Sequence, residues 1–326
     1  MSAPHVTVVL LNWNGWRDTL ECLDSLLRVQ GVAMTVVVCD NASSDGSFEQ
    51  MQDWVRRQPG AMPWLLEQPG RCETAALSDS LRKLVLLRNS GNLGFAGGNN
   101  PGIRLALEDP ACEYVWLLNN DTTIEPDALA QAVARMRADP AIGICGSTLV
   151  YYHERAMVQA LGGASYSPAR GTSRHIGAFI GRDAVPAAPE AVETQMSYAV
   201  GAAMLVSRAF VEQVGLMRED YFLYYEEIDW AMRGAGRFRL GYAPASVVYH
   251  KEGATIGTSA SGGSAISVYY LFRNRLLFTR RFYPLRLLSV IPYCLWDILK
   301  FALKGQTKQA WAGLRGAGAF FAPTRN

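Results

Sequence analysis

The stretch Tyr114-Val115-Trp116-Leu117-Leu118-Asn119-Asn120-Asp121-Thr122-Thr123 joins a short apolar run directly to a polar turn. The apolar run is typical of a buried strand, so the turn begins where that strand leaves a sheet. Ligands of α/β proteins bind at the carboxyl ends of such strands, and a carboxylate there suits a hard cation. A second interpretation is equally open at this point: Asp121 or Thr122 would merely cap the helix expected from Pro126.

The first 150 residues alternate between strand and helix patterns, which is typical of a parallel sheet with crossover helices. We therefore expect an α/β fold with a mixed, mainly parallel sheet flanked by helices. Strands are predicted over residues 6–11, 34–39, 83–87 and 114–118. Helices are predicted over residues 16–27, 47–57 with Ser47 as its cap, 126–137, and from the glycine-rich residues 89–100 to residue 108.

The later residues show a looser pattern. Residues 58–71 indicate a loop or an insertion, and residues 162–188, rich in Gly, Ser, Pro and Ala, indicate a mobile loop or a hairpin. The pattern loosens beyond residues 142–152, order returns over residues 198–206, and a last short strand is predicted over residues 247–249. Helices are predicted from residue 208, over residues 224–233, and through the remainder of the chain.

Composition indicates a folded protein, because 49% of the 326 residues are hydrophobic and 18% are charged. No signal peptide pattern opens the chain, and no run of about 18 apolar residues predicts a membrane span. The cysteines lack metal-ligand spacing, and several lie in apolar runs, so we expect buried, reduced thiols. They are Cys22, Cys39, Cys72, Cys112, Cys145 and Cys294.

Charge is distributed unevenly along the chain. Residues 1–252 carry a formal charge of −7, whereas residues 253–326 carry +9, with ten basic residues and one acid, Asp297. Basic charge interleaved with apolar side chains suits an anionic surface. The aliphatic run 285–303 favours a lipid headgroup layer over nucleic acid. The alternative is an amphipathic end that packs on the core or on a second subunit, as in a homodimer.

Polar residues follow several of the predicted strands. Asn12, Asp40 and Asp121 would converge on one edge of a parallel sheet. The turn after Asp40 would accept hydrogen bonds from a nucleobase or a ribose, although an Asx turn explains it equally well. The glycine-rich residues 89–100 permit close approach to a ligand, but they lack the G-x-G-x-x-G spacing of a dinucleotide loop and the Gly-Lys-Ser/Thr of a Walker loop.

Three acids open the helix predicted over residues 224–233. Asp229 and Arg233 have the spacing of an ion pair, so at least one acid is expected to be structural. The preceding tyrosines would keep a neighbouring carboxylate partly desolvated and basic, as a general base requires. His250 ends a predicted strand and would either be structural or complete a metal or phosphate site.

Together and in this order, the segments 7–14 (Thr-Val-Val-Leu-Leu-Asn-Trp-Asn), 38–43, 89–100, Asn120-Asp121 and Glu226-Glu227 resemble the inverting glycosyltransferase family 2, whose members have a GT-A fold. Residues 222–233 and 250–253 look most like its bacterial rhamnosyltransferase branch. The resemblance covers roughly residues 4–255. It implies a GT-A domain over residues 1–255 and a basic, apolar helical appendage over residues 256–326.

The resemblance also implies roles for single residues. Asp40 would bind the nucleotide base in a pocket lined by Leu11 and Trp13. Gly94, Phe95 and Gly97 would shape the nucleotide-sugar cleft, together with Asn120. Asp121 matches the last acid of the family's D-x-D motif and, with His250, would hold Mg²⁺ or Mn²⁺. Asn119 replaces the first acid, so the metal should arrive largely with the donor diphosphate. Glu227 matches the catalytic base, with Glu in place of the family's Asp.

The implied function is transfer of a sugar, L-rhamnose from dTDP-rhamnose, onto a lipid-linked saccharide for a bacterial surface polysaccharide. The enzyme would lie in the cytoplasm, peripherally on the inner face of the cell membrane, and would not bind nucleic acid. Another UDP- or GDP-linked donor is the first alternative. A nucleotide-binding oxidoreductase and a non-catalytic membrane-binding scaffold are alternatives from other classes.

Overall fold

The computed structural model describes residues 4–58, 71–74, 81–251 and 263–321. Their main feature is a sheet with the strand order β3-β4-β2-β1-β5-β12-β7-β13-β6, with β8 paired to β7. Its strands are β1 (His5–Asn12), β2 (Ala33–Asp40), β3 (Arg71–Thr74), β4 (Leu81–Arg88), β5 (Cys112–Asn119), β6 (Thr122–Ile124), β7 (Ile142–Tyr151), β8 (Val158–Leu161), β12 (Ala203–Ser207) and β13 (Arg239–His250). Strands β4, β2, β1 and β5 run parallel to one another, and β12 is antiparallel to β5 and β7. The sheet is therefore mixed, with a parallel half formed by the first 120 residues.

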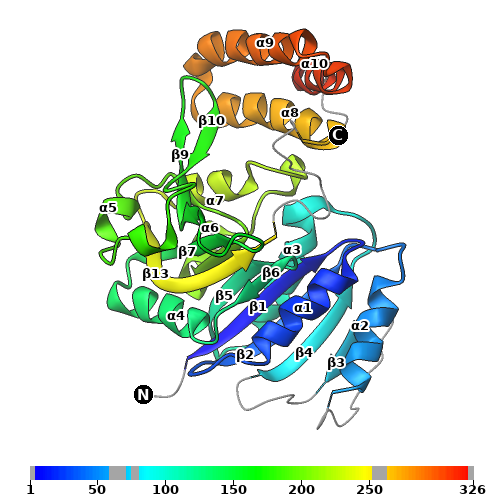
Figure 1. The fold of residues 1–326 in the computed structure, drawn as a ribbon, viewed down its shortest axis with the longest axis vertical. Helices are drawn as coiled ribbons and strands as arrows, with labels where there is room; N and C mark the ends of the chain where they lie inside the picture. The colour runs from blue at the N-terminus through cyan, green and yellow to red at the C-terminus, as the bar shows by residue number, and fades with distance from the viewer. Residues whose placement is uncertain (1–3, 59–70, 75–80, 252–262, 322–326) are drawn as a thin grey trace.

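Helices cover both faces of this sheet (Figure 1). Helices α1 (Trp16–Leu26), α2 (Ser47–Arg56) and α4 (Ala128–Ala138) pack on one face, and α3 (Gly94–Glu108), α6 (Arg208–Val214) and α7 (Glu226–Gly234) pack on the other. Alternation along β1 shows this directly, since Val8 belongs to the first core cluster and Val9 to the second. Burial of both faces explains why these strands read as continuous apolar runs. The expected α/β fold with helix-flanked, mainly parallel sheet is confirmed.

A small second sheet rises beside the main one. It consists of β9 (Gly163–Ser167), β10 (Thr172–His175) and β11 (Tyr198–Ala199), in the order β10-β9-β11. The hairpin alternative for residues 162–188 is therefore confirmed for its first part, while a 3-10 turn and the short helix α5 (Glu190–Glu193) follow. The hairpin projects toward the helices formed by residues 265–321 (Figure 1).

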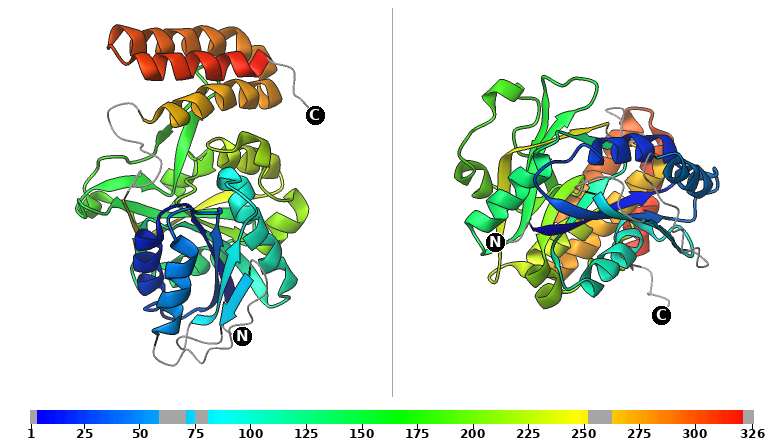
Figure 2. Two further views of the ribbon diagram at one scale, coloured as in Figure 1. Left: turned by 90° about the vertical axis from the view of Figure 1, so that its right-hand side faces the viewer. Right: turned by 90° about the horizontal axis from the view of Figure 1, so that it is seen from below.

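The chain ends in three helices that stack on one side of the sheet domain (Figure 2). They are α8 (Ala265–Phe282), α9 (Leu287–Leu303) and α10 (Thr307–Phe321), and we call them the C-terminal helices. They share a small core of their own that includes Phe272, Leu276 and Cys294. The expected domain boundary at residue 255 lies outside the described residues. Among the described residues, no helix combines the length and the apolar character needed to cross a bilayer.

The structure corrects several local predictions. Thr122–Ile124 forms strand β6, which pairs with β13, and α4 begins only at Ala128 with Asp127 at its N-cap. The helix-cap interpretation of Asp121 and Thr122 is therefore wrong. Ser47 is likewise not a cap, because it is the first residue of α2 and its hydroxyl bonds to Asp45.

Other elements differ in length from their prediction. Strand β13 has twelve residues instead of the three predicted. The ordered segment expected over residues 198–206 contains β11 and most of β12, and β3 begins at the last residue of the predicted loop 58–71. Residues 59–70 of that loop lie outside the described part. The five cysteines whose side chains are described are free and buried, as expected: Cys22, Cys39, Cys112, Cys145 and Cys294. Cys72 falls outside the described side chains.

Candidate active site

A cavity of about 540 Å³ opens at the carboxyl edge of the parallel strands. This size falls in the range of small-molecule sites. Residues from many parts of the fold line it. They are Leu11 of β1 and Trp13 just after it, Phe95 of α3, Asn119 at the end of β5 with Asn120 and Asp121 after it, Gln159 of β8, His250 of β13, Thr172, Ser173, His175 and Tyr198 of the small sheet, Val200, Gly201 and Ala202 before β12, Leu223, Tyr224 and Tyr225 before α7, Glu226, Glu227 and Ile228 of α7, and Leu271 of α8. Of the predicted site residues, Leu11, Trp13, Phe95, Asn120, Asp121, Glu227 and His250 are thus brought together.

Beneath the cavity, the ends of β1 and β2 are joined by hydrogen bonds. Asp40 is fully buried, and its carboxylate accepts from Asn12 Nδ2 at 2.7 Å and from Ser43 Oγ at 2.6 Å. Asn120 Nδ2 donates to Thr19 Oγ1 at 2.9 Å, which ties the β5 end to α1. The strand ends therefore meet as the parallel topology requires. Asp40 itself does not line the cavity, so its contact with a nucleotide base stays a prediction.

The glycine-rich segment is mostly helix α3, and its glycines allow close packing within the protein. A Cβ on Gly94, whose φ is +72°, would lie 2.1 Å from the carbonyl oxygen of Phe222, and one on Gly98 would lie 2.4 Å from Leu11 Cδ1. Phe95 N donates to the same Phe222 oxygen at 2.7 Å. Gly94 and Gly97 are absent from the cavity wall, whereas Phe95 lines it. These glycines therefore bring α3 against β1 and against the turn before α7.

Asp121 and His250 form a pair on the cavity wall. Asp121 Oδ1 lies 3.2 Å from His250 Nε2, and His250 Nδ1 bonds to Gln159 Oε1 at 2.9 Å. Because the Gln159 oxygen accepts only, Nδ1 is the donor in that bond, and Nε2 is left facing the carboxylate of Asp121. A carboxylate and an imidazole nitrogen are both metal ligands, so this pair suits a cation. Among the described residues, no group of three or more His, Cys, Asp or Glu could hold a metal ion.

The three acids at the start of α7 have different surroundings. Glu227 lines the cavity, its carboxylate receives a hydrogen bond from the Gly201 backbone, and burial raises its pKa. Glu226 is 2% exposed, its Oε2 has no hydrogen-bond partner among the described residues, and burial followed by the adjacent Glu227 raises its pKa well above the usual carboxyl range. Asp229 is fully buried and paired with Arg233, whose Nε lies 2.7 Å from Oδ1. The predicted structural ion pair is present.

Several residues of the cavity wall were not predicted from the sequence. Gln159 orients His250, Tyr198 lies beside Glu227 and Glu226, and Leu271 comes from the C-terminal helices. The small sheet adds Thr172, Ser173 and His175. Sequence offers no signal for these, because none lies at the end of a predicted strand or in a motif.

Comparison with known proteins agrees with this architecture. Residues 71–174 match the family model described as Glycosyl transferase family 2. The low-salt glycan biosynthesis hexosyltransferase Agl10 of Haloferax volcanii is 26% identical over 274 residues, which are 83% of this chain and 74% of the relative.

Solved structures with the same architecture are more distant in sequence. The mannosyltransferase PcManGT of Pyrobaculum calidifontis, in complex with GDP-Man and Mn²⁺, is 18% identical with a TM-score of 0.55, over 98% of this chain and 76% of that one. TarS 1–349 of S. aureus, in complex with UDP-GlcNAc, is 13% identical with a TM-score of 0.56, over 97% of this chain and 80% of that one. The chain therefore has the GT-A fold of these solved structures, and its residues 71–174 are similar to glycosyl transferase family 2.

Proposed function

We propose that this chain is a metal-dependent, inverting glycosyltransferase, with Glu227 as the general base. One observation carries the proposal: a single cavity is lined both by the Asp121–His250 pair, which suits a cation, and by the desolvated carboxylate of Glu227. A metal-assisted leaving group and a base for the acceptor are the two groups that a one-step sugar transfer requires. Binding both substrates in one cavity supplies the orientation.

The donor end is assigned to the wall formed by Leu11, Trp13 and Phe95. An indole and a phenyl ring suit the faces of a nucleobase and a ribose. Asp40 supports this wall from below through Asn12. The donor is proposed to be dTDP-L-rhamnose, because residues 222–233 and 250–253 resemble rhamnosyltransferases. A UDP- or GDP-linked hexose is the second candidate, favoured by the hexosyltransferase relative and by the GDP-Man and UDP-GlcNAc complexes of the structural neighbours.

Asp121 and His250 would hold the divalent ion, Mg²⁺ or Mn²⁺, and Gln159 fixes the ring of His250 for that task. When bound, such an ion offsets the negative charge that builds on the departing diphosphate. The use of Mn²⁺ by structural neighbours supports a divalent metal. A single carboxylate implies weak affinity for the ion in the absence of donor.

Glu227 takes the proton of the acceptor hydroxyl as its oxygen forms a bond to the anomeric carbon. The bond from that carbon to the donor phosphate oxygen breaks, and its electron pair leaves with the nucleoside diphosphate. One displacement inverts the anomeric configuration. Burial raises the pKa of Glu227 and therefore makes the ionised carboxylate a stronger base than an exposed one.

The acceptor is proposed to be a lipid-linked saccharide, reached from the inner face of the cell membrane. Except for Leu93 and Phe179, all the exposed large hydrophobic residues in the described part lie on or beside the C-terminal helices, including Leu288 at 84% and Leu303 at 75% exposure. This segment also carries the excess basic charge. Apolar insertion combined with attraction to anionic headgroups would hold the helices at a bilayer surface. Leu271 on α8 lines the cavity, so the active site lies next to that surface.

The test of function is a donor screen scored by release of nucleoside diphosphate, with Mn²⁺ and with EDTA. We expect dTDP-rhamnose or a UDP- or GDP-hexose to be turned over only with metal. Glu227→Gln should lower kcat by about 10²–10⁴-fold and keep nucleotide binding, while the exposed Glu190→Gln serves as a control. Wild-type turnover by Glu227→Gln would show that another acid is the base, and stabilisation by NAD alone would indicate an oxidoreductase.

A further inference from the structure

The turn that precedes Glu227 has an unusual backbone. Phe222, Tyr224 and Tyr225 have φ angles of +65°, +68° and +76°, in the region that disfavours bulky side chains. Such a backbone conformation is costly and persists only where its surroundings enforce it. Because α7 begins at Glu226, directly after this turn, the turn sets where the Glu227 side chain lies. The contacts that hold the turn are therefore of functional interest.

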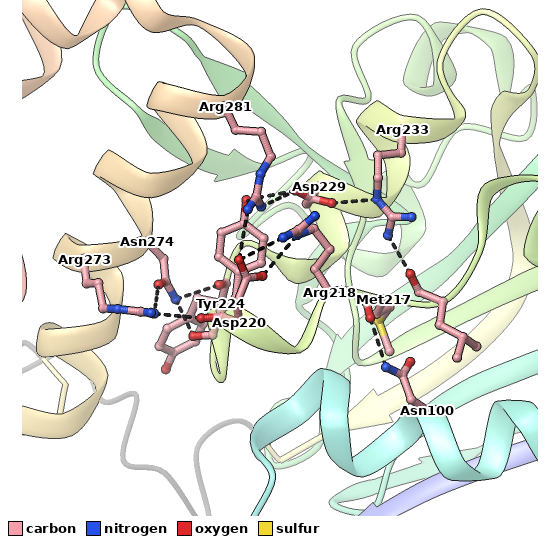
Figure 3. Close-up of polar contacts among 12 residues, drawn as sticks. Asn100, Met217, Arg218, Asp220, Tyr224, Asp229, Arg233, Arg273, Asn274 and Arg281 are labelled. Atoms are coloured by element: carbon pink, nitrogen blue, oxygen red, sulfur yellow. Dashed lines mark hydrogen bonds and ion pairs between the residues drawn. The ribbon is translucent and has the colours of Figure 1, made fainter. Parts of the chain in front are cut away.

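Helix α8 supplies the central contact through Asn274 (Figure 3). Asn274 is fully buried, and its Nδ2 lies 2.8 Å from the carbonyl oxygens of Tyr221 and Leu223 and 3.1 Å from that of Tyr224. Its Oδ1 accepts from Arg273 at 2.8 Å, which fixes the orientation of the amide. One side chain thus binds three successive parts of the strained turn.

Arg281 lies two helical turns further along the same side of α8 and adds contacts to the same region. Its guanidinium contacts Asp229 Oδ2 at 2.9 Å, Tyr221 Oη at 2.7 Å and Asp220 Oδ2 at 2.9 Å. Asp229 belongs to α7, so Arg281 bridges the turn and the helix that follows it (Figure 3). Bonds between a guanidinium and a buried carboxylate are among the stronger ones in proteins.

The opposite side of the turn rests on α3. Phe95 N donates to Phe222 O. In the segment before the turn, Met217 O accepts from Asn100 Nδ2 at 2.9 Å (Figure 3). The turn is therefore clamped between α3, which supplies Phe95 to the cavity wall, and α8, which belongs to the C-terminal helices.

We propose that Asn274 is a positioning residue for the transfer reaction: from α8 it holds the strained turn 221–225 and so places Glu227 in the cavity. This inference rests on the proposed role of Glu227 as base. Asn274 acts on kcat through the carboxylate, because its hydrogen bonds reach neither Leu11, which lies on β1, nor Trp13, which follows β1. A purely structural residue would instead affect only the stability of the fold.

The test uses Asn274→Asp, which keeps the shape of the side chain but places an oxygen opposite three carbonyl oxygens. We expect kcat to fall by about 10–100-fold, while the KM for the donor and the nucleoside diphosphate affinity with Mn²⁺ change less than about twofold. Thr279→Val is the matched control, because Thr279 is a buried polar residue of α8 whose hydroxyl bonds within its own helix. It should keep wild-type kcat despite any loss of Tm.

A double variant separates this inference from the proposed function. In a Glu227→Gln background, Asn274→Asp should cause no further loss, because both act through one carboxylate. Wild-type kcat in Asn274→Asp, with Glu227→Gln inactive, would overturn the positioning role alone. Activity of Glu227→Gln would overturn the proposed base. If Asn274→Asp does not fold, Arg281→Lys gives the same test, with a smaller fall in kcat at unchanged donor KM as the supporting result and unchanged kcat as the opposing one.

Discussion

Gly201→Ala should displace the proposed base with little effect on the fold. A Cβ at this position would lie 2.5 Å from Glu227 Oε1 and 3.1 Å from its Cγ. Restoring an ordinary contact requires the carboxylate to move by about 1 Å. Gly201 does not have a positive φ, and its N–H is retained in alanine. The clash is with the end of a flexible side chain, so we expect a stability change within about 1 kcal/mol.

A displacement of this size should lower kcat by about a hundredfold. The measurement is nucleoside diphosphate release at saturating donor and acceptor, with donor KM and Tm determined in parallel. Gly318→Ala is the control, because Gly318 is an exposed glycine of α10 with open space around its Cβ; it should keep wild-type kcat. Unchanged kcat in Gly201→Ala at wild-type Tm would refute the assignment of Glu227, since the added methyl cannot leave its carboxylate in place.

Further outcomes follow from the same structure. Glu226→Gln should raise Tm at neutral pH. The raised pKa of Glu226 makes the stability of the wild type fall as the pH rises above the ordinary carboxyl pKa of 4.5, and glutamine causes no such fall. The gain in Tm should therefore vanish below pH 4.5. Asp121→Asn should lower the metal-dependent turnover rate by about a hundredfold or more, measured at a donor concentration that saturates the wild type. In the pH profile of kcat/KM, activity should fall on the acid side at a pH above the ordinary carboxyl range, because Glu227 must be ionised to act and its pKa is raised. A fall that begins only near pH 4 would contradict this. Leu288→Glu should weaken sedimentation with phosphatidylglycerol vesicles while Phe179→Glu, an exposed control away from the C-terminal helices, should not; equal binding of both would point to a subunit interface.

The parallel half of the sheet was predictable because local pattern and topology agree there. Burial on both faces gives continuous apolar runs, and the chain direction then brings the ends of β1, β2 and β5 together. Strand β13 was predicted at a quarter of its length, because Gly241 and Pro244 interrupt the pattern at a register shift between Ala243 and Val247. Glycine and proline weaken a strand prediction that is made from local sequence. The full length of β13 is therefore evident only from its pairing with β7.

The site was predictable where a residue follows a strand and hidden where distant segments meet. His250 ends a strand and Asp121 follows one, and both were predicted from the sequence to lie at the site. Gln159 fixes His250 across 91 positions, and Gly201 contacts Glu227 from the link between β11 and β12. The ion pair of Asp229 with Arg233 has helical spacing, whereas its bond to Arg281 spans 52 positions. No periodicity encodes such contacts, because they depend on how complete elements pack.

The environments of the two adjacent glutamates argue for a division of roles between them. Burial raises the pKa of both, and the nearby Glu227 charge raises that of Glu226 further. Two desolvated carboxylates side by side do not both ionise readily, so the pair holds one proton over an extended pH range. Glu226, with an unpartnered oxygen and 2% exposure, is the better place for that proton. With Glu226 neutral, Glu227 ionises without a neighbouring charge and remains basic enough to accept the proton of the acceptor. Glutamine mimics a neutral carboxyl, so Glu226→Gln should retain transfer, whereas Glu227→Gln should lose it.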